Sequence, residues 1–157
     1  MSVGLIIIVG TLACMILDLW QRFLLFFFKV PPSNWAVVGR WLVYFLKSGR
    51  WVQSGIIKQD PIRNELYIGW VFHYFIAFIY SLFYFFLYKQ GFIEFGLKEG
   101  LVFGFISVIV PWFFFMPAMG AGLLGNKTPN PTLACFLALG AHGIFGGALG
   151  LFFKLFY

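Results

Sequence analysis

The chain has very few charged side chains. Only 10% of its 157 residues are Asp, Glu, Lys or Arg, whereas 62% are hydrophobic and 23% are aromatic. A soluble domain with so few charges would expose more apolar surface than water tolerates. Cysteine is also scarce, because only Cys14 and Cys135 are present. We expect these two to lie at different depths of a membrane, too far apart for a disulfide.

Four long apolar runs account for most of the chain. Each reaches the roughly 20 residues that a helix needs to cross a bilayer. The runs cover residues 3–28, 66–88, 97–123 and 132–156. We therefore predict an all-α fold, in which residues 1–157 form a single membrane domain with a bundle of four transmembrane helices.

A shorter apolar segment, residues 34–46, lies between the first two runs. It contains Trp35 and Trp41 but is too short to span a bilayer. On a helix, Arg40, Tyr44 and Lys47 would form one polar stripe. Tryptophan together with a cationic stripe is typical of a helix that lies in the headgroup layer. The sequence therefore predicts a short interfacial helix here.

Basic residues gather on one side of the predicted topology. Seven lie in the loops that follow the first and third runs: Lys29, Arg40, Lys47, Arg50, Lys58, Arg63 and Lys127. The opposite side holds three: Lys89, Lys98 and Lys154. Because basic loops stay in the cytoplasm, we predict a multi-pass protein with both termini outside. The same charges favour contacts with anionic membrane lipid and argue against nucleic acid as a partner.

The most informative residue is Asp18, a carboxylate inside the first apolar run. Such a group costs roughly 2.5–3.5 kcal/mol to insert, so it usually faces the interior of a bundle. Small residues at intervals of four place Asp18, His73 and His142 on helix faces that contact neighbours. We predict a buried polar site of Asp18, Arg22, His73 and His142. Alternatively, Asp18 and Arg22 neutralise one another at i, i+4, and the histidines only bond helices together.

Several other residues are candidates for supporting this site. They are Arg40, Met116, Pro117 and Met119. Two histidines and a carboxylate suit copper or zinc chemically, which makes His73, His142 and Asp18 weak candidates for metal ligands. No compact metal-binding or cofactor-binding motif is present, so the sequence identifies no cofactor.

A set of short motifs, in a fixed order along nearly the whole chain, resembles a family of small bacterial membrane proteins that is catalogued only as a domain of unknown function. The motifs are Asp18-Leu19-Trp20, Val38-Gly39-Arg40-Trp41, Gly69-Trp70 with His73-Tyr74, Met116-Pro117-Ala118 with Gly120 and Gly122, Thr128-Pro129 with Pro131, and His142-Gly143 with Phe145-Gly146. The resemblance implies a four-helix protein of the bacterial inner membrane and supplies no activity. It places family motif residues at Asp18, Arg40, His73 and His142.

The function that these features favour is a small carrier or permeation protein. In this hypothesis the Asp18, His73 and His142 side chains form one layer, which binds a proton, a cation or a small polar solute. A non-catalytic accessory or scaffold subunit of a membrane complex is the first alternative, and a lipid-modifying membrane enzyme is the second. The chain lacks a recognisable catalytic motif, which favours a protein that is not an enzyme. Its expected protein partners are a second copy of itself or another membrane subunit.

Overall fold

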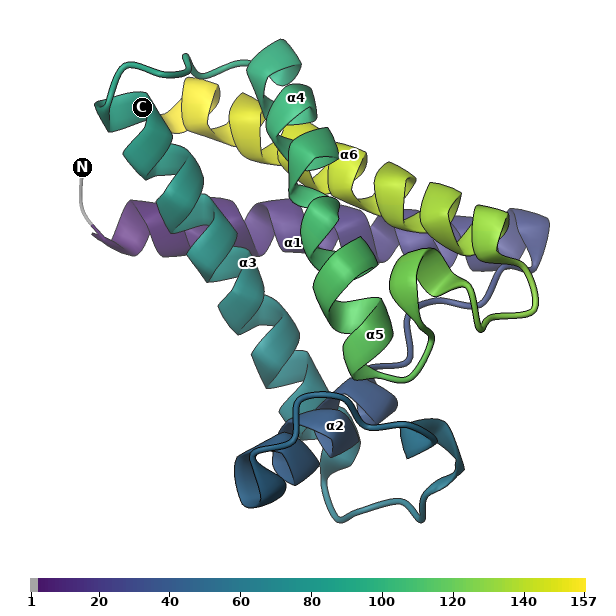
Figure 1. Cartoon of the computed structure of the whole chain (residues 1–157). Helices are drawn as coiled ribbons and strands as arrows, with labels where there is room; N and C mark the ends of the chain where they lie inside the picture. Colours follow the sequence, from purple (N-terminus) through teal and green to yellow (C-terminus); the bar gives the residue numbers. More distant parts are fainter. Residues whose placement is uncertain (1–2) are drawn as a thin grey trace. The chain divides into compact units, whose positions relative to one another are not determined.

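The computed structural model describes residues 3–157, and within that range all regular structure is helical. The elements are α1 (Val3–Phe28), α2 (Trp35–Ser48), α3 (Glu65–Lys89), α4 (Leu97–Ser107), α5 (Met116–Ala118) and α6 (Pro131–Phe156) (Figure 1). Two single 3-10 turns, Ile56–Lys58 and Leu123–Gly125, lie in the loops, and a π-helical turn, Pro111–Phe115, joins α4 to α5. The predicted all-α fold is confirmed.

Four helices are long and apolar enough to cross a membrane. They are Val3–Phe28, Glu65–Lys89, Leu97–Ala118 and Pro131–Phe156, the third of which combines α4, the π turn and α5. The predicted end of the third helix at residue 123 is wrong. Met119 already leaves helical geometry, with φ −90° and ψ 11°, and Gly120 has φ 80°. The sequence stays apolar beyond this point, but the backbone turns away.

The π turn lies where Pro111 removes a backbone donor from the helix. The amide of Met116 donates to the carbonyl of Pro111, five residues earlier, in place of the usual four. The third long helix is thus interrupted by a widened turn, which is followed by the early helix end.

The predicted short helix between the first two long helices is present as α2. Its first turn is capped by Asn34, whose side-chain oxygen accepts a hydrogen bond of 3.2 Å from the Val37 amide. Its last turn ends at Gly49 in left-handed geometry, with the Gly49 amide bonded to the Phe45 carbonyl. Its location at a membrane surface stays a prediction.

The chain forms two compact units, which we describe separately. Unit 1 contains residues 1–32, 74–107 and 139–157, and unit 2 contains residues 33–73 and 108–138. The boundary falls inside α3, between His73 and Tyr74. The prediction of a single membrane domain stays a prediction.

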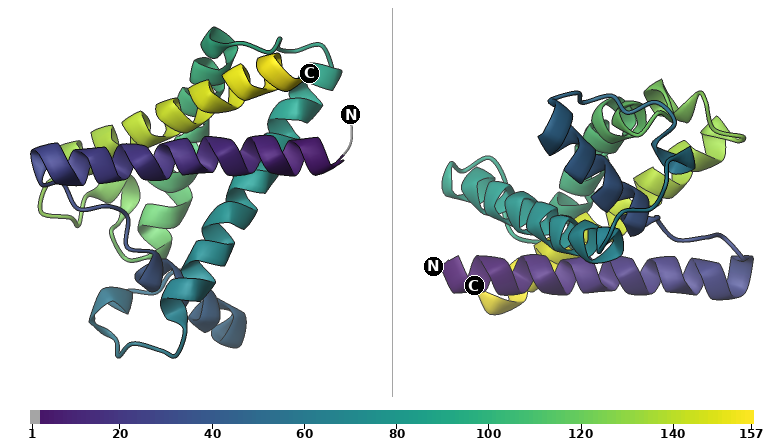
Figure 2. Two further views of the ribbon diagram at one scale, coloured as in Figure 1. Left: turned by 180° about the vertical axis from the view of Figure 1, so that it is seen from behind. Right: turned by 90° about the horizontal axis from the view of Figure 1, so that it is seen from below.

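Unit 1 is built from two close helix pairs. Glycines of α4 lie against α6, so that a Cβ added at Gly100 or Gly146 would come within 2.3 Å of the facing carbonyl oxygen. α1 crosses α3 at Gly10 (Figure 2), where the Ser81 hydroxyl donates a hydrogen bond of 2.8 Å to the Ile6 carbonyl. The core of the unit is formed by Val9, Ala13, Cys14, Ala77, Tyr84, Phe103, Phe145, Leu149 and Phe153.

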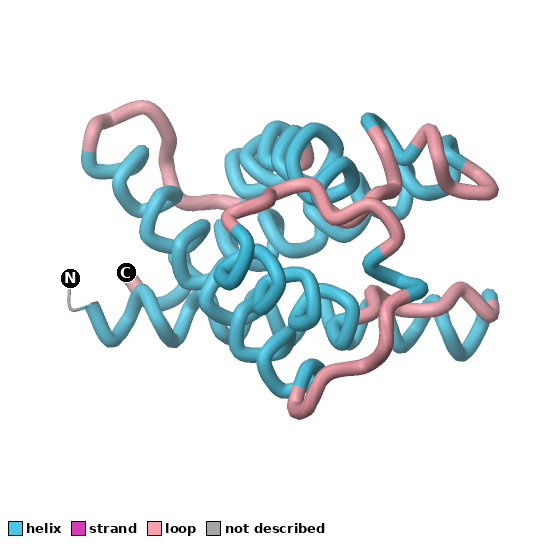
Figure 3. Tube along the Cα trace, turned by 60° about the horizontal axis from the view of Figure 1, so that its bottom comes forward, coloured by secondary structure: helices cyan, strands magenta, loops and turns pink. Residues whose placement is uncertain are grey.

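Unit 2 combines α2, the first turns of α3, the loop between them and the segment around α5. Its buried core is formed by Val37, Trp41, Ile56 and Ala118. The loop, residues 49–64, contains only one short turn of helix (Figure 3). It is tied to its surroundings by backbone bonds, since the Gln53 amide donates to the Ala118 carbonyl at 2.8 Å.

Candidate functional site: two polar pairs between helices of unit 1

Asp18 lies in the second half of α1 and is half-buried. The hydroxyl of Tyr74, on α3, donates a hydrogen bond of 2.9 Å to one of its carboxylate oxygens. This bond joins two apolar helices whose sequence positions differ by 56 residues. Arg22, one turn further along α1, is exposed. The first polar pair of unit 1 is therefore Asp18 with Tyr74.

His142 lies near the middle of α6 and faces two other helices, as its position on a small-residue stripe predicts. Its Nδ1 lies 2.7 Å from the hydroxyl of Ser107 at the end of α4. Its ring meets the ring of Tyr80, on α3, edge to face at a centroid distance of 5.8 Å. Ser107 is buried, and its hydroxyl also donates to the Gly104 carbonyl at 2.7 Å. The second polar pair is His142 with Ser107.

The second pair depends on the close approach of α4 to α6. A Cβ added at Gly104 would lie 2.2 Å from the His142 carbonyl oxygen, and one at Gly150 would lie 2.1 Å from the Gly96 carbonyl oxygen. Only glycine leaves room for such an approach. Ser107 follows Gly104 by one turn on the same helix, so the approach brings its hydroxyl to the His142 ring.

The two pairs use different residues of α3. Tyr74 bonds Asp18, whereas Tyr80 contacts His142. These tyrosines lie six positions apart, or about 9 Å along the helix axis. Unit 1 therefore holds two polar pairs along α3, each with its own partners.

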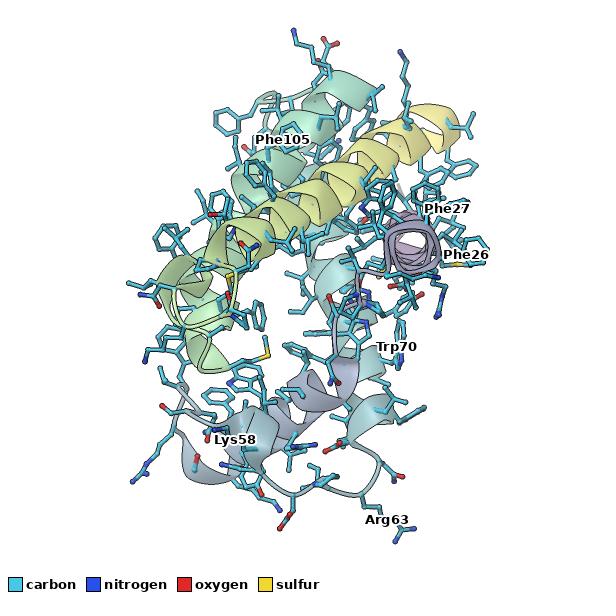
Figure 4. The ribbon with its side chains drawn as sticks, turned by 90° about the vertical axis from the view of Figure 1, so that its right-hand side faces the viewer. Phe26, Phe27, Lys58, Arg63, Trp70 and Phe105 are labelled. Atoms are coloured by element: carbon cyan, nitrogen blue, oxygen red, sulfur yellow. The ribbon has the colours of Figure 1, made fainter. Side chains whose placement is uncertain are left out.

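The residues of unit 2 that the sequence singled out lie in another setting. His73 is buried, and its ring stacks on Trp35 of α2 at 3.8 Å between centroids. Trp70 meets the same ring edge to face at 5.7 Å, and Figure 4 labels this tryptophan on α3. The stack needs α2 and α3 to touch: a Cβ added at Gly69 would lie 1.8 Å from the Trp35 carbonyl oxygen.

Arg40 does not belong to an exposed cationic stripe, which corrects that interpretation of α2. It is only 5% exposed, and its guanidinium binds both carboxylate oxygens of Glu65 at 2.8 and 2.9 Å. The same guanidinium donates to the Ile56 carbonyl at 3.1 Å and to the Gln59 carbonyl. The planar five-donor group of arginine suits this combination.

The Arg40 charge is constant. The hydrogen bonds that Arg40 donates to Glu65 raise the pKa of Arg40 above its ordinary value, so the guanidinium stays protonated. Glu65 also accepts from the Ile62 amide at 2.9 Å. Arg40 therefore holds the loop against the start of α3, and its place is structural within unit 2.

The supporting candidates of the third helix also lie in unit 2. Met119 packs against the core of Val37, Trp41, Ile56 and Ala118. The Met116 side chain lies beside Gly125, in the turn that follows the helix. Pro117 follows Met116 in the last helical turn, α5. The proposed metal ligands His73, His142 and Asp18 stay a prediction.

Sequence reasoning missed three partners that the structure supplies. Tyr74 and Ser107 complete the polar pairs, and Glu65 neutralises Arg40. The signal for Ser107 was present, because it continues the glycine stripe Gly96, Gly100, Gly104 on the same face. Tyr74 is part of a family motif, but nothing in the sequence pairs it with Asp18, and Glu65 has no such signal.

These features define a class: an all-helical protein with four helices of membrane length and ionisable side chains bonded between them. The chain belongs to the DUF2938 family of proteins of unknown function, whose pattern matches residues 7–155. This confirms the resemblance to a domain of unknown function. Comparison with curated proteins and with solved structures finds no match.

Proposed function

We propose that this protein is a small carrier or permeation protein that binds a proton, a cation or a small polar solute at the two polar pairs of unit 1. The observation that supports the proposal most is the Asp18–Tyr74 bond, which holds a carboxylate between two helices of membrane length. A carboxylate in a membrane helix usually has a functional role, because inserting it into the bilayer costs free energy.

The positions of the four side chains along their helices support the same proposal. Asp18 lies about ten residues before the end of α1, and Tyr74 about nine after the start of α3. Ser107 lies about eleven before the end of the third long helix, and His142 about eleven after the start of α6. If each helix crosses the membrane once, these ends share one side, and the groups lie roughly 14–17 Å from it.

Two ionisable side chains are available in such a set, the carboxylate of Asp18 and the imidazole of His142. Chains of aspartate and histidine between membrane helices are typical of proton and cation pathways. His73 is our third candidate for this role, as the sequence predicts.

Flux through reconstituted vesicles tests the proposal. Protein in vesicles loaded with a pH-sensitive dye should speed the decay of an imposed pH gradient relative to protein-free vesicles. Asp18→Asn keeps an oxygen that accepts from Tyr74 but cannot ionise, so it should remove the flux. The matched control is Asp60→Asn, which changes an exposed carboxylate in the loop of unit 2. Sodium, potassium and ammonium gradients extend the assay to small cations.

Two outcomes would overturn this proposal. If none of these gradients decays faster with protein and a membrane subunit co-purifies stoichiometrically, an accessory or scaffold subunit is the better assignment. If a lipid in the vesicles is chemically altered instead, the protein is a lipid-modifying enzyme.

We also propose that the protein lies in a bacterial inner membrane with both termini outside, and that the loop of unit 2 contacts anionic lipid. The support is a group of exposed cations in that unit: Lys47, Arg50, Lys58, Arg63 and Lys127. Figure 4 labels Lys58 and Arg63 beside the chain's loop. A reporter fused to the C-terminus should be active only when exported, and a cytoplasmic C-terminus would contradict the orientation.

A further inference from the structure

The hydroxyl of Ser107 has two neighbours and only one hydrogen. The Gly104 carbonyl oxygen and the Nδ1 of His142 each lie 2.7 Å from it. A serine hydroxyl donates one hydrogen bond and accepts through its lone pairs. Which neighbour receives the hydrogen therefore decides the state of the histidine.

The carbonyl settles the choice, because a carbonyl oxygen can only accept. If the Ser107 hydrogen pointed at Nδ1, two oxygen lone pairs would face each other at 2.7 Å with no hydrogen between them. The hydrogen must therefore point at Gly104, so the Ser107 oxygen accepts from the ring. Assigning the tautomer from the hydrogen-bond network in this way is the usual procedure.

We infer that Ser107 holds neutral His142 in the tautomer that carries its hydrogen on Nδ1, so that Nε2 is the atom at which His142 takes up a proton. The second half of this statement rests on the proposed function, whereas the tautomer does not. Free histidine in water favours the opposite tautomer, with hydrogen on Nε2. Ser107 is thus a positioning residue for His142.

The proton is taken up without breaking the existing bond. A proton adds to the lone pair of Nε2 and an N–H bond forms there, while the other hydrogen stays on Nδ1 and is still donated to the Ser107 oxygen. The Ser107 oxygen accepts in both states, and the bond strengthens when the ring becomes positive. Tyr80 of α3 also meets the His142 ring, edge to face, while Tyr74, six positions earlier on α3, donates to Asp18.

The geometry of α4 makes this arrangement rigid. Ser107 is bonded to the carbonyl of its own helix, and that carbonyl belongs to Gly104, the residue that touches the His142 backbone. The Ser107 hydroxyl, the Gly104 carbonyl that accepts from it and the Gly104 contact with the His142 backbone therefore lie within one turn of α4. Rotation of the serine side chain away from the ring would break two bonds of 2.7 Å at once.

Nitrogen NMR of the intact protein in lipid bilayers tests the inference. The chain has two histidines, so labelling histidine with 15N gives two ring systems, and the one that disappears in His142→Gln belongs to His142. At about pH 8, above the ordinary imidazole pKa, we expect hydrogen on Nδ1 and none on Nε2. On acidification the Nε2 signal should become that of a protonated nitrogen while Nδ1 stays protonated.

Two serine variants make the test specific to Ser107. Ser107→Ala should lose the pure Nδ1-protonated state and show hydrogen on Nε2 in at least part of the molecules. The matched control is Ser81→Ala, which removes another buried serine whose hydroxyl bonds a carbonyl, that of Ile6, in the same unit. It should leave the His142 signals unchanged.

Hydrogen on Nε2 in the unmodified protein at this pH would overturn the inference. So would a tautomer that is the same in Ser107→Ala as in the unmodified protein. Neither measurement requires flux. A correct tautomer with no transport would overturn the proposed function alone, and transport with the wrong tautomer would overturn only the role of Ser107.

Discussion

The contact between α4 and α6 makes opposite predictions for two glycines on the same helix. In Gly146→Ala the new methyl carbon would lie 2.3 Å from the Gly100 carbonyl oxygen and 2.6 Å from the Gly104 Cα. In Gly140→Ala it would meet nothing within 4 Å. The chemical change is identical, so the helix contact alone distinguishes the two variants.

The magnitude follows from the gap that must open. Ordinary contact needs about 3.4 Å, so α4 and α6 must move apart by about 1 Å, and overpacking of this kind costs roughly 1–3 kcal/mol. The same shift would stretch the Ser107–His142 bond past hydrogen-bonding distance and remove about 0.6 kcal/mol more. Removing glycine from a helix returns roughly 0.5–1 kcal/mol. We expect a net loss of about 1–3 kcal/mol for Gly146→Ala and a small gain for Gly140→Ala.

Reversible unfolding in mixed micelles, followed by circular dichroism as the denaturing detergent fraction rises, measures both. The Gly146→Ala transition should move to less denaturing detergent and the Gly140→Ala transition should not. If both variants shift alike, the close approach of α4 and α6 is wrong, and with it the position of Ser107 beside His142.

Three further variants test the other contacts. Tyr74→Phe should cost only about 0.6 kcal/mol in the same unfolding assay, because bonds between membrane helices average that value, and a loss of several kcal/mol would show that the Asp18 bond has a larger role. Arg40→Lys cannot bind both oxygens of Glu65, so trypsin should cut the loop of unit 2 faster, and unchanged cleavage would contradict the proposed tether. Gly39→Ala would place a methyl carbon 1.9 Å from the Glu65 carbonyl oxygen, which should force α2 away from α3. The intensity or the emission maximum of tryptophan fluorescence should then change, and an unchanged spectrum would argue against that contact.

The four long helices could be predicted because length and apolarity alone determine them. The end of the third helix could not, because hydropathy carries no information about backbone angles. Residues 119–125 carry no charged or polar side chain, yet Gly120 and Leu124 both have positive φ, at 80° and 52°. The start of α6 was predicted to within one residue, because Pro131 cannot follow helical structure but suits the first helical position.

The candidate site shows the same division. The faces of Asp18 and His142 could be predicted, since small residues at intervals of four mark a helix contact. Their partners could not, because a partner depends on which helix lies opposite and how it is rotated. Arg40 is an example: its place in a basic segment predicted that it faces the headgroups, but the structure buries it. The carboxylate that buries it is 25 residues away, at the first position of α3.

The glycines between α4 and α6 also limit how this protein can assemble. Repeats of glycine every four residues are usually associated with self-association in membranes, but here one chain uses both halves of the repeat on itself. A second copy would find that surface occupied. At its end, α1 leaves Phe26, Phe27 and Phe28 each more than 60% exposed. An oligomer that formed through these large aromatic side chains would compete with acyl chains for the same contacts, so its strength should vary with the lipid around it.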